Sequence, residues 1–450
     1  FSYAMVIKYI IHNLKFMSNF IINGGNKLTG SIHTNSAKNS AIAILCSLLM
    51  IKGKTTLTNI PLIEEVNRII EILTSIGLKI RFNNNNNNLE IINNGEINFK
   101  TINKQAYQKT RVTILFIGAL VHKYKNFLLP KVSGCKLGKR TVNPHIIALE
   151  RFGIIVKKLN NKYSITSKQV KGSDFTMYES GDTATENAIL AAVLAKGKTK
   201  INLASSNYMV QDLCCFLNQA GAKIKNIGET KLEIIGVKKL HPVKNYSIMP
   251  DPIESMAFIS MAIATASKLK ITGCPIDFLR LELEKLRVMG QKIKISQTYK
   301  SLNNYFNLVD IEIIPSCLRA LPDKIYSRPF PGLNIDNLPL FVPILTTAHG
   351  QTLVHDWVYE NRAIYYTELN KLGAKIMLLD QHRVIITGPT KFKPAIVDCP
   401  PALRPAINLF IAMLAARGKS ILKNCYSIER GYANLCERLN KIGADIKRED

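Results

Sequence analysis

The sequence predicts an α/β protein built from six copies of one supersecondary unit and arranged as two globular halves. A helix-to-strand corner of the KLGAKI type recurs six times, with successive corner glycines 68 to 83 residues apart. These glycines are Gly77, Gly153, Gly221, Gly290, Gly373 and Gly443. A second glycine turn precedes four of the corners by 23 to 25 residues. Since a single core stops growing at about 250 to 300 residues, a chain of 450 residues favours two halves of three units each.

Each corner follows from local chemistry. An amphipathic helix ends in leucine or isoleucine, glycine takes the left-handed position after it, and alternating apolar residues continue as a strand. The second turn, as in AKGKTKINLA from Ala195, indicates a helix end, a glycine turn and a strand. Each unit therefore carries at least two helices and several strands. It is longer than a typical solenoid repeat, which favours a closed bundle over an open array.

The composition is that of a globular protein, with 47% hydrophobic and 20% charged residues. The formal net charge of +28 at pH 7 suggests anionic partners. Nucleic acid is one candidate, but the basic residues are spread along the chain and form no recognised nucleic-acid module. A biased base composition of the coding DNA is the simpler explanation of the many lysines, asparagines and isoleucines, and we prefer it. We therefore predict neither a nucleic-acid nor a membrane partner.

The cysteines and the N-terminus indicate a cytoplasmic protein. Nine cysteines occur without metal-ligand spacing, several in apolar helices, as expected for buried thiols in a reducing compartment. The first sixteen residues are apolar but contain Lys8, His12 and Lys15, and are too short to span a bilayer. We treat residues 1–16 as an N-terminal extension and Met17 as a natural start. The sequence predicts no oligomeric state.

The loop that follows Leu128 carries the most chemically active groups of the chain. Cys135 is flanked there by basic residues, which would favour a thiolate in an empty site and gather an anionic ligand. A bound anion would offset those charges and return the thiol to its protonated form, which suits a proton donor. An incidental loop cysteine is the alternative. Asn143 is predicted to cap the next helix, with Pro144 at its first position. The basic residues of this loop are Lys131, Lys136, Lys139 and Arg140.

Cationic side chains recur where helices are predicted to begin. Lys38 and Asn39 fall in the first turn of a long apolar helix, where a cation opposes the helix dipole unless an anion binds between them. Arg404 precedes Pro405, the predicted first residue of another apolar helix, and Arg362 precedes a third. A lone arginine at a helix start is usually a solvated surface residue. A bound phosphate or carboxylate would explain all these positions together.

Asp336 lies between a proline-glycine turn and an apolar run, where a carboxylate could be kept from bulk water as a general base. A turn or capping aspartate is the alternative reading of the same position. The sequence contains no phosphate-binding GxxxxGK[ST] loop, dinucleotide fingerprint, metal-ligand cluster or serine elbow. We therefore expect no cofactor and no metal.

Seven ordered motifs resemble those of the enolpyruvyl transferases, in particular the branch whose acceptor is UDP-N-acetylglucosamine. The resemblance covers residues 19 to 446. One such motif would be a weak signal, but seven in family order are specific. The motifs are GSIHTNSAKNSAIAIL, SGCKLGKR, ATENAILAAVLAKG, PDPIES, PGLNID, YENRAIYYTELNKLGA and ERGY.

The resemblance implies two inside-out α/β barrel domains, each of three βαβαββ repeats, around an interdomain cleft. In this family the chain crosses between domains twice. We therefore place residues 39–247, with the cysteine loop, in one domain. Residues 17–38 and 248–450, with Asp336 and Arg404, form the other, so that Lys38 and Asn39 lie at the hinge.

The resemblance also implies the reaction: the enolpyruvyl group of phosphoenolpyruvate moves to the 3′-hydroxyl of UDP-N-acetylglucosamine, with release of phosphate. Cys135 matches the proton donor and the thiol that the antibiotic fosfomycin alkylates. Asp336 matches the aspartate at the acceptor hydroxyl. Lys38, Arg140 and Arg404 match the cationic clamp. The remaining expected substrate-binding residues are Asn39, Arg111, Thr141, Val142, Asn143, Pro144, Val358 and Arg362.

Two departures from the family pattern concern the nucleotide rather than the chemistry. Asn143 stands where the family usually has aspartate, and SGDTATEN from Ser180 replaces a segment that commonly reads SVGATEN. An alternative enzyme is enolpyruvylshikimate-phosphate synthase, but that branch lacks a cysteine at the loop position and carries an early N-A-G-T-A-x-R stretch that is absent here. A basic, non-catalytic repeat protein that binds RNA is the alternative from another class.

Overall fold

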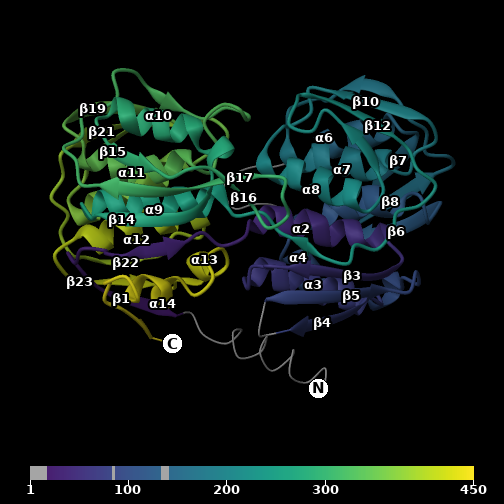
Figure 1. The fold of residues 1–450 in the computed structure, drawn as a ribbon, viewed down its shortest axis with the longest axis horizontal. Helices are drawn as coiled ribbons and strands as arrows, with labels where there is room; N and C mark the ends of the chain where they lie inside the picture. The colour runs from purple at the N-terminus through teal and green to yellow at the C-terminus, as the bar shows by residue number, and fades with distance from the viewer. Residues whose placement is uncertain (1–17, 84–86, 133–140, 450) are drawn as a thin grey trace.

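The computed structural model describes residues 18–83, 87–132 and 141–449 as two lobes that lie side by side (Figure 1). One lobe holds the elements coloured purple to teal, from α2 to β12. The other holds those coloured green to yellow together with the N-terminal strand β1. Within the described residues, no helix combines the length and the apolar composition that a bilayer span requires.

Three sheets belong to the first lobe, and two of them share one strand order, in which a parallel pair is followed by two antiparallel strands. The first sheet is β13(Tyr246–Ser247)-β3(Gly53–Thr58)-β5(Asn88–Asn93)-β4(Lys79–Asn83). The second is β6(Asn126–Pro130)-β8(Lys162–Ser167)-β7(Ile154–Lys158), which has three strands among the described residues. The third is β9(Asp174–Thr176)-β10(Lys198–Asn202)-β12(Lys231–Ile235)-β11(Lys223–Lys225). The helices of this lobe are α2(Lys38–Ser47), α3(Glu64–Ser75), α4(Lys104–Gln108), α5(Phe116–Leu120), α6(Asn143–Glu150), α7(Asp182–Ala192) and α8(Tyr208–Gln219), with 3₁₀ turns η1(Leu48–Met50), η2(Phe99–Thr101) and η3(Val112–Leu115).

The other three sheets repeat this order in the second lobe. The first is β2(Ser31–His33)-β14(Leu269–Pro275)-β17(Asn307–Ile314)-β15(Lys292–Ile295), with β16(Tyr299–Lys300) beside β17. The second is β18(Ile325–Tyr326)-β19(Gly350–His355)-β21(Arg383–Gly388)-β20(Lys375–Asp380). The third is β22(Ile396–Asp398)-β23(Gly418–Lys423)-β1(Asn19–Gly24)-β24(Ile446–Glu449). The helices are α9(Pro252–Ala264), α10(Arg280–Val288), α11(Leu338–Thr347), α12(Leu403–Ala415), α13(Tyr426–Glu429) and α14(Leu435–Asn440), with the 3₁₀ segments η4(Ile276–Phe278) and η5(Ala363–Leu372).

The predicted corners are confirmed as turns that need glycine. All six corner glycines have positive φ, between 79° and 116°, a region that other residues rarely adopt. Each closes a helix and leads into the third strand of a unit. The six-fold repeat read from the sequence is therefore the repeat of the fold.

The helices lie inside and the sheets outside, as the inside-out class predicts. α9, α11 and α12 pack against one another in the centre of the second lobe, and nearly all their residues are buried. α2, α5 and α7 take the same place in the first lobe. The sheets are separate, and among the described strands none closes into a continuous barrel. This arrangement turns the starts of the central helices toward the region between the lobes.

Strand exchange completes three of the sheets, through pairings that the sequence did not predict. β2 precedes α2 in the chain but pairs with β14 of the other lobe, while β13 precedes α9 and pairs with β3. β1, at the N-terminal end of the described chain, lies between β23 and β24 and supplies the last strand of the sixth unit. The two chain crossings between the lobes therefore run beside each other.

Three local predictions were wrong. α6 begins at Asn143 rather than Pro144, and α12 begins at Leu403 rather than Pro405. No side chain caps either helix, so nothing marks these starts in the sequence; the Asn143 side-chain oxygen accepts a hydrogen bond from Lys158 instead. The segment after Arg362 is a 3₁₀ helix rather than an α-helix.

Candidate active site

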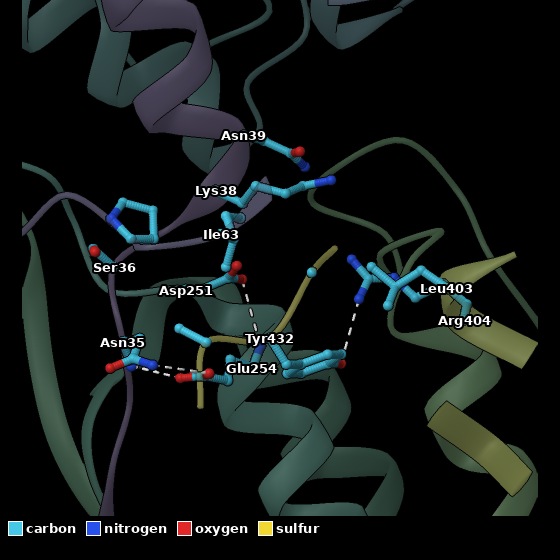
Figure 2. A pocket seen from close by; sticks show the side chains of 13 residues that line it. Asn35, Ser36, Lys38, Asn39, Ile63, Asp251, Glu254, Leu403, Arg404 and Tyr432 are labelled. Atoms are coloured by element: carbon cyan, nitrogen blue, oxygen red, sulfur yellow. Dashed lines mark hydrogen bonds between the residues drawn. The ribbon is translucent and has the colours of Figure 1, made fainter. Parts of the chain in front are cut away.

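A pocket lies where the two crossing strands meet the starts of three central helices (Figure 2). α2, α9 and α12 begin at its wall, and the first N–H groups of a helix favour an anion. At α9 the Asp251 side chain already accepts hydrogen bonds from the N–H groups of Ile253 (2.8 Å) and Glu254 (3.4 Å). The lining residues are Asn35, Ser36, Lys38, Asn39, Pro61, Ile63, Asp251, Glu254, Leu403, Arg404, Gly431, Tyr432 and Ala433.

Lys38, the first residue of α2, lines the pocket and has a partner that the sequence did not reveal. Its Nζ lies 2.5 Å from Glu65 Oε2, in the first turn of α3, and both side chains are mostly buried. Burial alone would raise the pKa of Glu65, but Lys38, Arg430 and Arg404 together hold it below its usual value. Glu65 is therefore an ionised counter-charge inside a cationic cluster.

Arg404 and Asp336 form the second ion pair of the site. Arg404 Nη2 lies 3.3 Å from Asp336 Oδ2, and Arg404 Nη1 donates to the Tyr432 hydroxyl at 3.4 Å, the contact drawn beside Arg404 in Figure 2. Burial would raise the pKa of Asp336, but Arg404, Arg362 and Lys38 hold it below its usual value. The carboxylate is therefore ionised and able to accept a proton, although its neighbours make it a weak base while Arg404 stays in contact.

Asn39 and Asp251 complete the polar wall. Asn39 Nδ2 donates to the hydroxyl of Tyr208, a fully buried residue at the start of α8. Burial raises the pKa of Asp251 to about 6, against the opposing effect of Arg404. Neither Asp251 nor Tyr208 was predicted as a site residue. The PDPIES motif, in which Asp251 caps a helix, was the available signal.

Arg362 lies behind Asp336 rather than in the pocket wall. Its side chain is 1% exposed, and its Nε and Nη2 atoms bond both oxygens of Asp356 at 2.5 and 2.8 Å. Nη2 also donates to the Ile335 carbonyl, and Nη1 lies 3.8 Å from Asp336 Oδ1. In this structure the arginine holds the segment that carries Asp336.

The residues expected at the nucleotide lie together in the first lobe. Arg111 Nη2 donates to the Thr141 carbonyl at 2.6 Å, at the start of the segment that leads into α6. Val142 and Pro144 are buried, whereas Thr141 and Asn143 are exposed. Val358, half-buried, follows β19 in the second lobe. Two predicted catalytic residues, Cys135 and Arg140, lie outside the described residues.

The arrangement concentrates cations around two carboxylates, with helix N-termini at the wall. Such a site can bind a small, multiply charged anion and stabilise negative charge that develops on it. Arg430, which acts on Glu65 beside Lys38 and Arg404, was also missed; it lies in the ERGY motif. No group of three or more ligating side chains that could hold a metal occurs among the described residues.

Comparison with known proteins identifies the class that this fold and site define. The structure superposes on the enolpyruvyl transferase NikO from Streptomyces tendae with a TM-score of 0.84, over 96% of this chain and 99% of that one, at 22% identity. EPSP synthase from Acinetobacter baumannii gives a TM-score of 0.72 over 96% and 100% of the two chains, at 18% identity. At these identities the likeness establishes the fold, which is that of the enolpyruvyl transferases.

The family follows from the sequence. Residues 22–439 match the family model of EPSP synthase (3-phosphoshikimate 1-carboxyvinyltransferase), so the chain belongs to this family of enolpyruvyl transferases. The UDP-N-acetylglucosamine 1-carboxyvinyltransferase of Bacteroides thetaiotaomicron is 32% identical over 439 residues, which cover 96% of this chain and 100% of the relative. UDP-N-acetylglucosamine 1-carboxyvinyltransferase 1 of Carboxydothermus hydrogenoformans is 34% identical over 432 residues, which cover 96% of this chain and 98% of the relative.

Proposed function

We propose that the protein transfers the enolpyruvyl group of phosphoenolpyruvate to the 3′-hydroxyl of UDP-N-acetylglucosamine, with release of phosphate. This is the first committed step of peptidoglycan precursor synthesis, on which cell-wall formation, cell shape and division depend. The relatives that match almost the whole chain carry the name of this activity. The observation that carries the proposal is the pocket lined by Lys38 and Arg404, the second of which pairs with an ionised Asp336 beside the pocket.

Each site residue has a separate part in this reaction. Lys38, Arg404 and Arg140 bind the phosphate and carboxylate of the donor. Asp336 accepts the proton of the acceptor hydroxyl as its oxygen attacks carbon 2 of the donor, and the Cys135 thiol delivers a proton to carbon 3. Loss of a proton from carbon 3 then breaks the bond to phosphate. The intermediate is multiply anionic at the reacting centre, so fixed cations and helix N-termini there stabilise it more than they stabilise either reactant.

The acceptor lies, in this proposal, between the two lobes. Arg111 and residues 141–144, which belong to the domain of residues 39–247, contact the nucleotide. Asn39 and Val358 lie toward the sugar and the donor, and Arg362 supports Asp336 from behind. Residues 17–38 and 248–450 form the other domain. Hydrogen bonds between the two crossing strands, from Ala37 N to Met249 O (2.7 Å) and from Asp251 N to Asn35 O (2.8 Å), support a hinge at this place.

We also propose a cytoplasmic location and small-molecule partners only, without nucleic acid or membrane. The eight described cysteines are free thiols, several of them buried, as expected in a reducing compartment. The basic residues that the site uses are engaged with carboxylates of the protein itself, which suits a small anion.

The deciding experiment is a phosphate-release assay with phosphoenolpyruvate and one of two acceptors. We expect release with UDP-N-acetylglucosamine and none with shikimate 3-phosphate. Release with shikimate 3-phosphate alone would assign the chain to the other branch. No release with either acceptor, together with RNA binding that weakens steeply with salt, would favour the RNA-binding alternative.

A second experiment tests Cys135. Fosfomycin should alkylate this thiol alone, because it is the cysteine with a basic sequence environment, whereas burial raises the pKa of Cys46, Cys214 and Cys274. Peptide mass spectrometry locates the adduct. An adduct on another cysteine would remove Cys135 from the mechanism.

A further inference from the structure

Asp356 is the most completely buried charged group near the site, and the reaction as described does not use it. Its side chain is fully buried at the end of β19, and it forms a two-bonded ion pair with Arg362. Arg362 is in turn enclosed, with the ring of Tyr359 4.3 Å from its guanidinium carbon. Such a pair is expensive to bury and gains little stability over apolar packing, so its presence calls for a function.

Asp356 is itself fixed from two further elements. The hydroxyl of Tyr366, on η5, donates to Asp356 Oδ2. In the turn between β20 and β21, the carbonyl of His382 accepts from the Asp356 N–H at 2.7 Å, and the His382 ring lies 3.1 Å from the Asp356 carbonyl. The carboxylate therefore has one orientation available, and Arg362 takes its position from it.

Arg362 transmits this position to the base. Through Nη2 it holds the carbonyl of Ile335 at 2.7 Å, directly before Asp336, and through Nη1 it lies 3.8 Å from the Asp336 carboxylate. The charges alternate along a line from Asp356 through Arg362 and Asp336 to Arg404. A change of charge at Asp356 therefore alters the electrostatic environment of Asp336.

We propose that Asp356 is a positioning residue for the transferase reaction, which acts through Arg362 to orient Asp336 and to limit the positive charge that Asp336 experiences. It contacts neither substrate. The inference rests on the proposed function, since it assumes that Asp336 is the base.

The physical reason is competition for one guanidinium. While Asp356 occupies Nε and Nη2, Arg362 gives Asp336 only a long contact, and Asp336 stays free to accept a proton once an anionic donor engages Arg404. Without Asp356 the full charge of Arg362 turns toward Asp336 and makes it a weaker base. In the part of the chain that the structure describes, other ionisable groups around these two carboxylates are Lys38, Tyr208, Tyr359, Tyr366 and His382.

The test compares Asp356→Asn with the double variant Asp356→Asn/Arg362→Gln, which removes the unbalanced charge as well. For Asp356→Asn we expect kcat to fall about 100-fold, as for a displaced catalytic group, with KM for UDP-N-acetylglucosamine little changed. In its plot of kcat against pH, the fall in rate on the acidic side, the acid limb, should move to lower pH. In the double variant kcat stays low, but the acid limb returns toward that of the wild type. An acid limb that is the same in all three proteins overturns the proposal.

Tyr366→Phe removes one bond to Asp356 and guards against an Asp356→Asn variant that does not fold. It should show a smaller change of kcat in the same direction, with an unchanged circular dichroism spectrum. A lower melting temperature with unchanged kcat in the folded protein would make Asp356 purely structural and would overturn the proposal.

A titration of the Asp336 carboxyl by carbon-13 NMR, assigned with Asp336→Asn, separates this inference from the proposed function. In ligand-free Asp356→Asn the carboxyl should titrate at lower pH than in the wild type, whether or not the wild type turns over these substrates. If the wild type is inactive but the titration shifts, the proposed function fails and the link from Asp356 to Asp336 stands. If the wild type is active and the titration does not shift, the link fails.

Discussion

Two carboxylates of the site occupy the cations that a substrate needs, and this competition decides what single substitutions do. Asp336 contacts Arg404, and Glu65 contacts Lys38. A donor that binds both cations would release both carboxylates. For Asp336 the consequence is a stronger base, because the pKa that Arg404 holds down recovers when the donor takes over that arginine.

Asp336→Asn should therefore lower kcat by about 10²- to 10⁴-fold, the usual contribution of a general base, and leave KM nearly unchanged. The amide keeps the shape and can still contact Arg404, but it cannot take up a proton. Steady-state phosphate release measured over a range of acceptor concentrations gives kcat and KM separately. Equal losses in affinity and turnover would instead indicate a binding role.

Glu65→Gln should tighten the binding of inorganic phosphate by about tenfold, equivalent to ~1.4 kcal/mol, because Lys38 loses the carboxylate that competes with the ligand. Glu71→Gln is the matched control, since Glu71 lies on the same helix but pairs with Arg68. Isothermal titration calorimetry reports both affinities. Weaker binding in Glu65→Gln would show that Glu65 holds Lys38 in its binding position rather than competing for it.

The sequence predicted the residues whose local context is unusual, and missed their partners. Lys38 and Arg404 were predicted because a cation at a helix start is locally unfavourable, and Asp336 because a carboxylate precedes an apolar run. Glu65 looks like an ordinary acidic first-turn residue, and its role arises only when α3 meets α2. Counter-charges of this kind come from distant parts of the chain, which no local pattern records.

The turns and helices of the repeated unit were predictable, because they depend on local conformation. The strand pairings were not, because they depend on distant parts of the chain. Glycine turns and amphipathic helices are visible in the sequence, and all six corners are found. The exchange of β2 and β13, and the insertion of β1 between β23 and β24, involve partners more than 180 residues apart in the chain. No local pattern in these short segments identifies the partner strand.

Two glycine substitutions separate the conformational and steric costs of a corner. Gly197 and Gly443 have similar φ, 98° and 103°, but a Cβ at Gly197 meets nothing within 4 Å, whereas one at Gly443 lies 2.9 Å from the Lys27 carbonyl oxygen. Gly197→Ala should lower the free energy of unfolding by about 1 to 2 kcal/mol, the cost of left-handed backbone, and Gly443→Ala by clearly more. Urea unfolding measures both. Equal losses would mean that the chain around Lys27 moves aside without cost.

Asp212 on α8 gives the fold a pH dependence. It accepts hydrogen bonds from the Tyr246 hydroxyl of β13 (2.6 Å) and from the N–H of Met249 in the crossing strand (3.3 Å), and burial raises its pKa to about 7. The folded state therefore binds a proton more tightly than the unfolded chain does, because an aspartate in the unfolded chain has a pKa of about 4. The stabilisation that this proton gives to the folded state is fully present below about pH 4 and is lost as the pH rises through about 7.

Between pH 5 and pH 8 this group should reduce the free energy of unfolding by about 2 kcal/mol. Asp212→Asn, which does not titrate, should lose that part of the pH dependence even if it is less stable throughout. Denaturant unfolding at both pH values gives the comparison. An identical difference between the two pH values in wild type and variant would place the titrating group elsewhere.

The molecule as a whole consists of two lobes that share one site and are connected by two crossing strands and by direct packing, such as that of Tyr208 against Phe278. Each lobe has three sheets around its own central helices, and Ser36 and Pro250 pair where the crossing strands run side by side. Lys38 opens a helix of the first lobe, while Arg404 opens one of the second. A ligand held by both cations adds a further connection between the lobes.

Differential scanning calorimetry should show this connection. Without ligand, lobes with separate cores should unfold in two resolved transitions. With UDP-N-acetylglucosamine and inorganic phosphate at about 100 times their dissociation constants, binding adds about 2.7 kcal/mol per site and should raise and merge the transitions, since neither lobe can then unfold without releasing the ligands. Arg404→Ala should still bind the nucleotide but keep two transitions, because the phosphate loses its contact with the second lobe. A single transition in the ligand-free protein would mean that the crossing strands and the packing between the lobes already make the molecule one cooperative unit, and that substrate binding need not bring the lobes together.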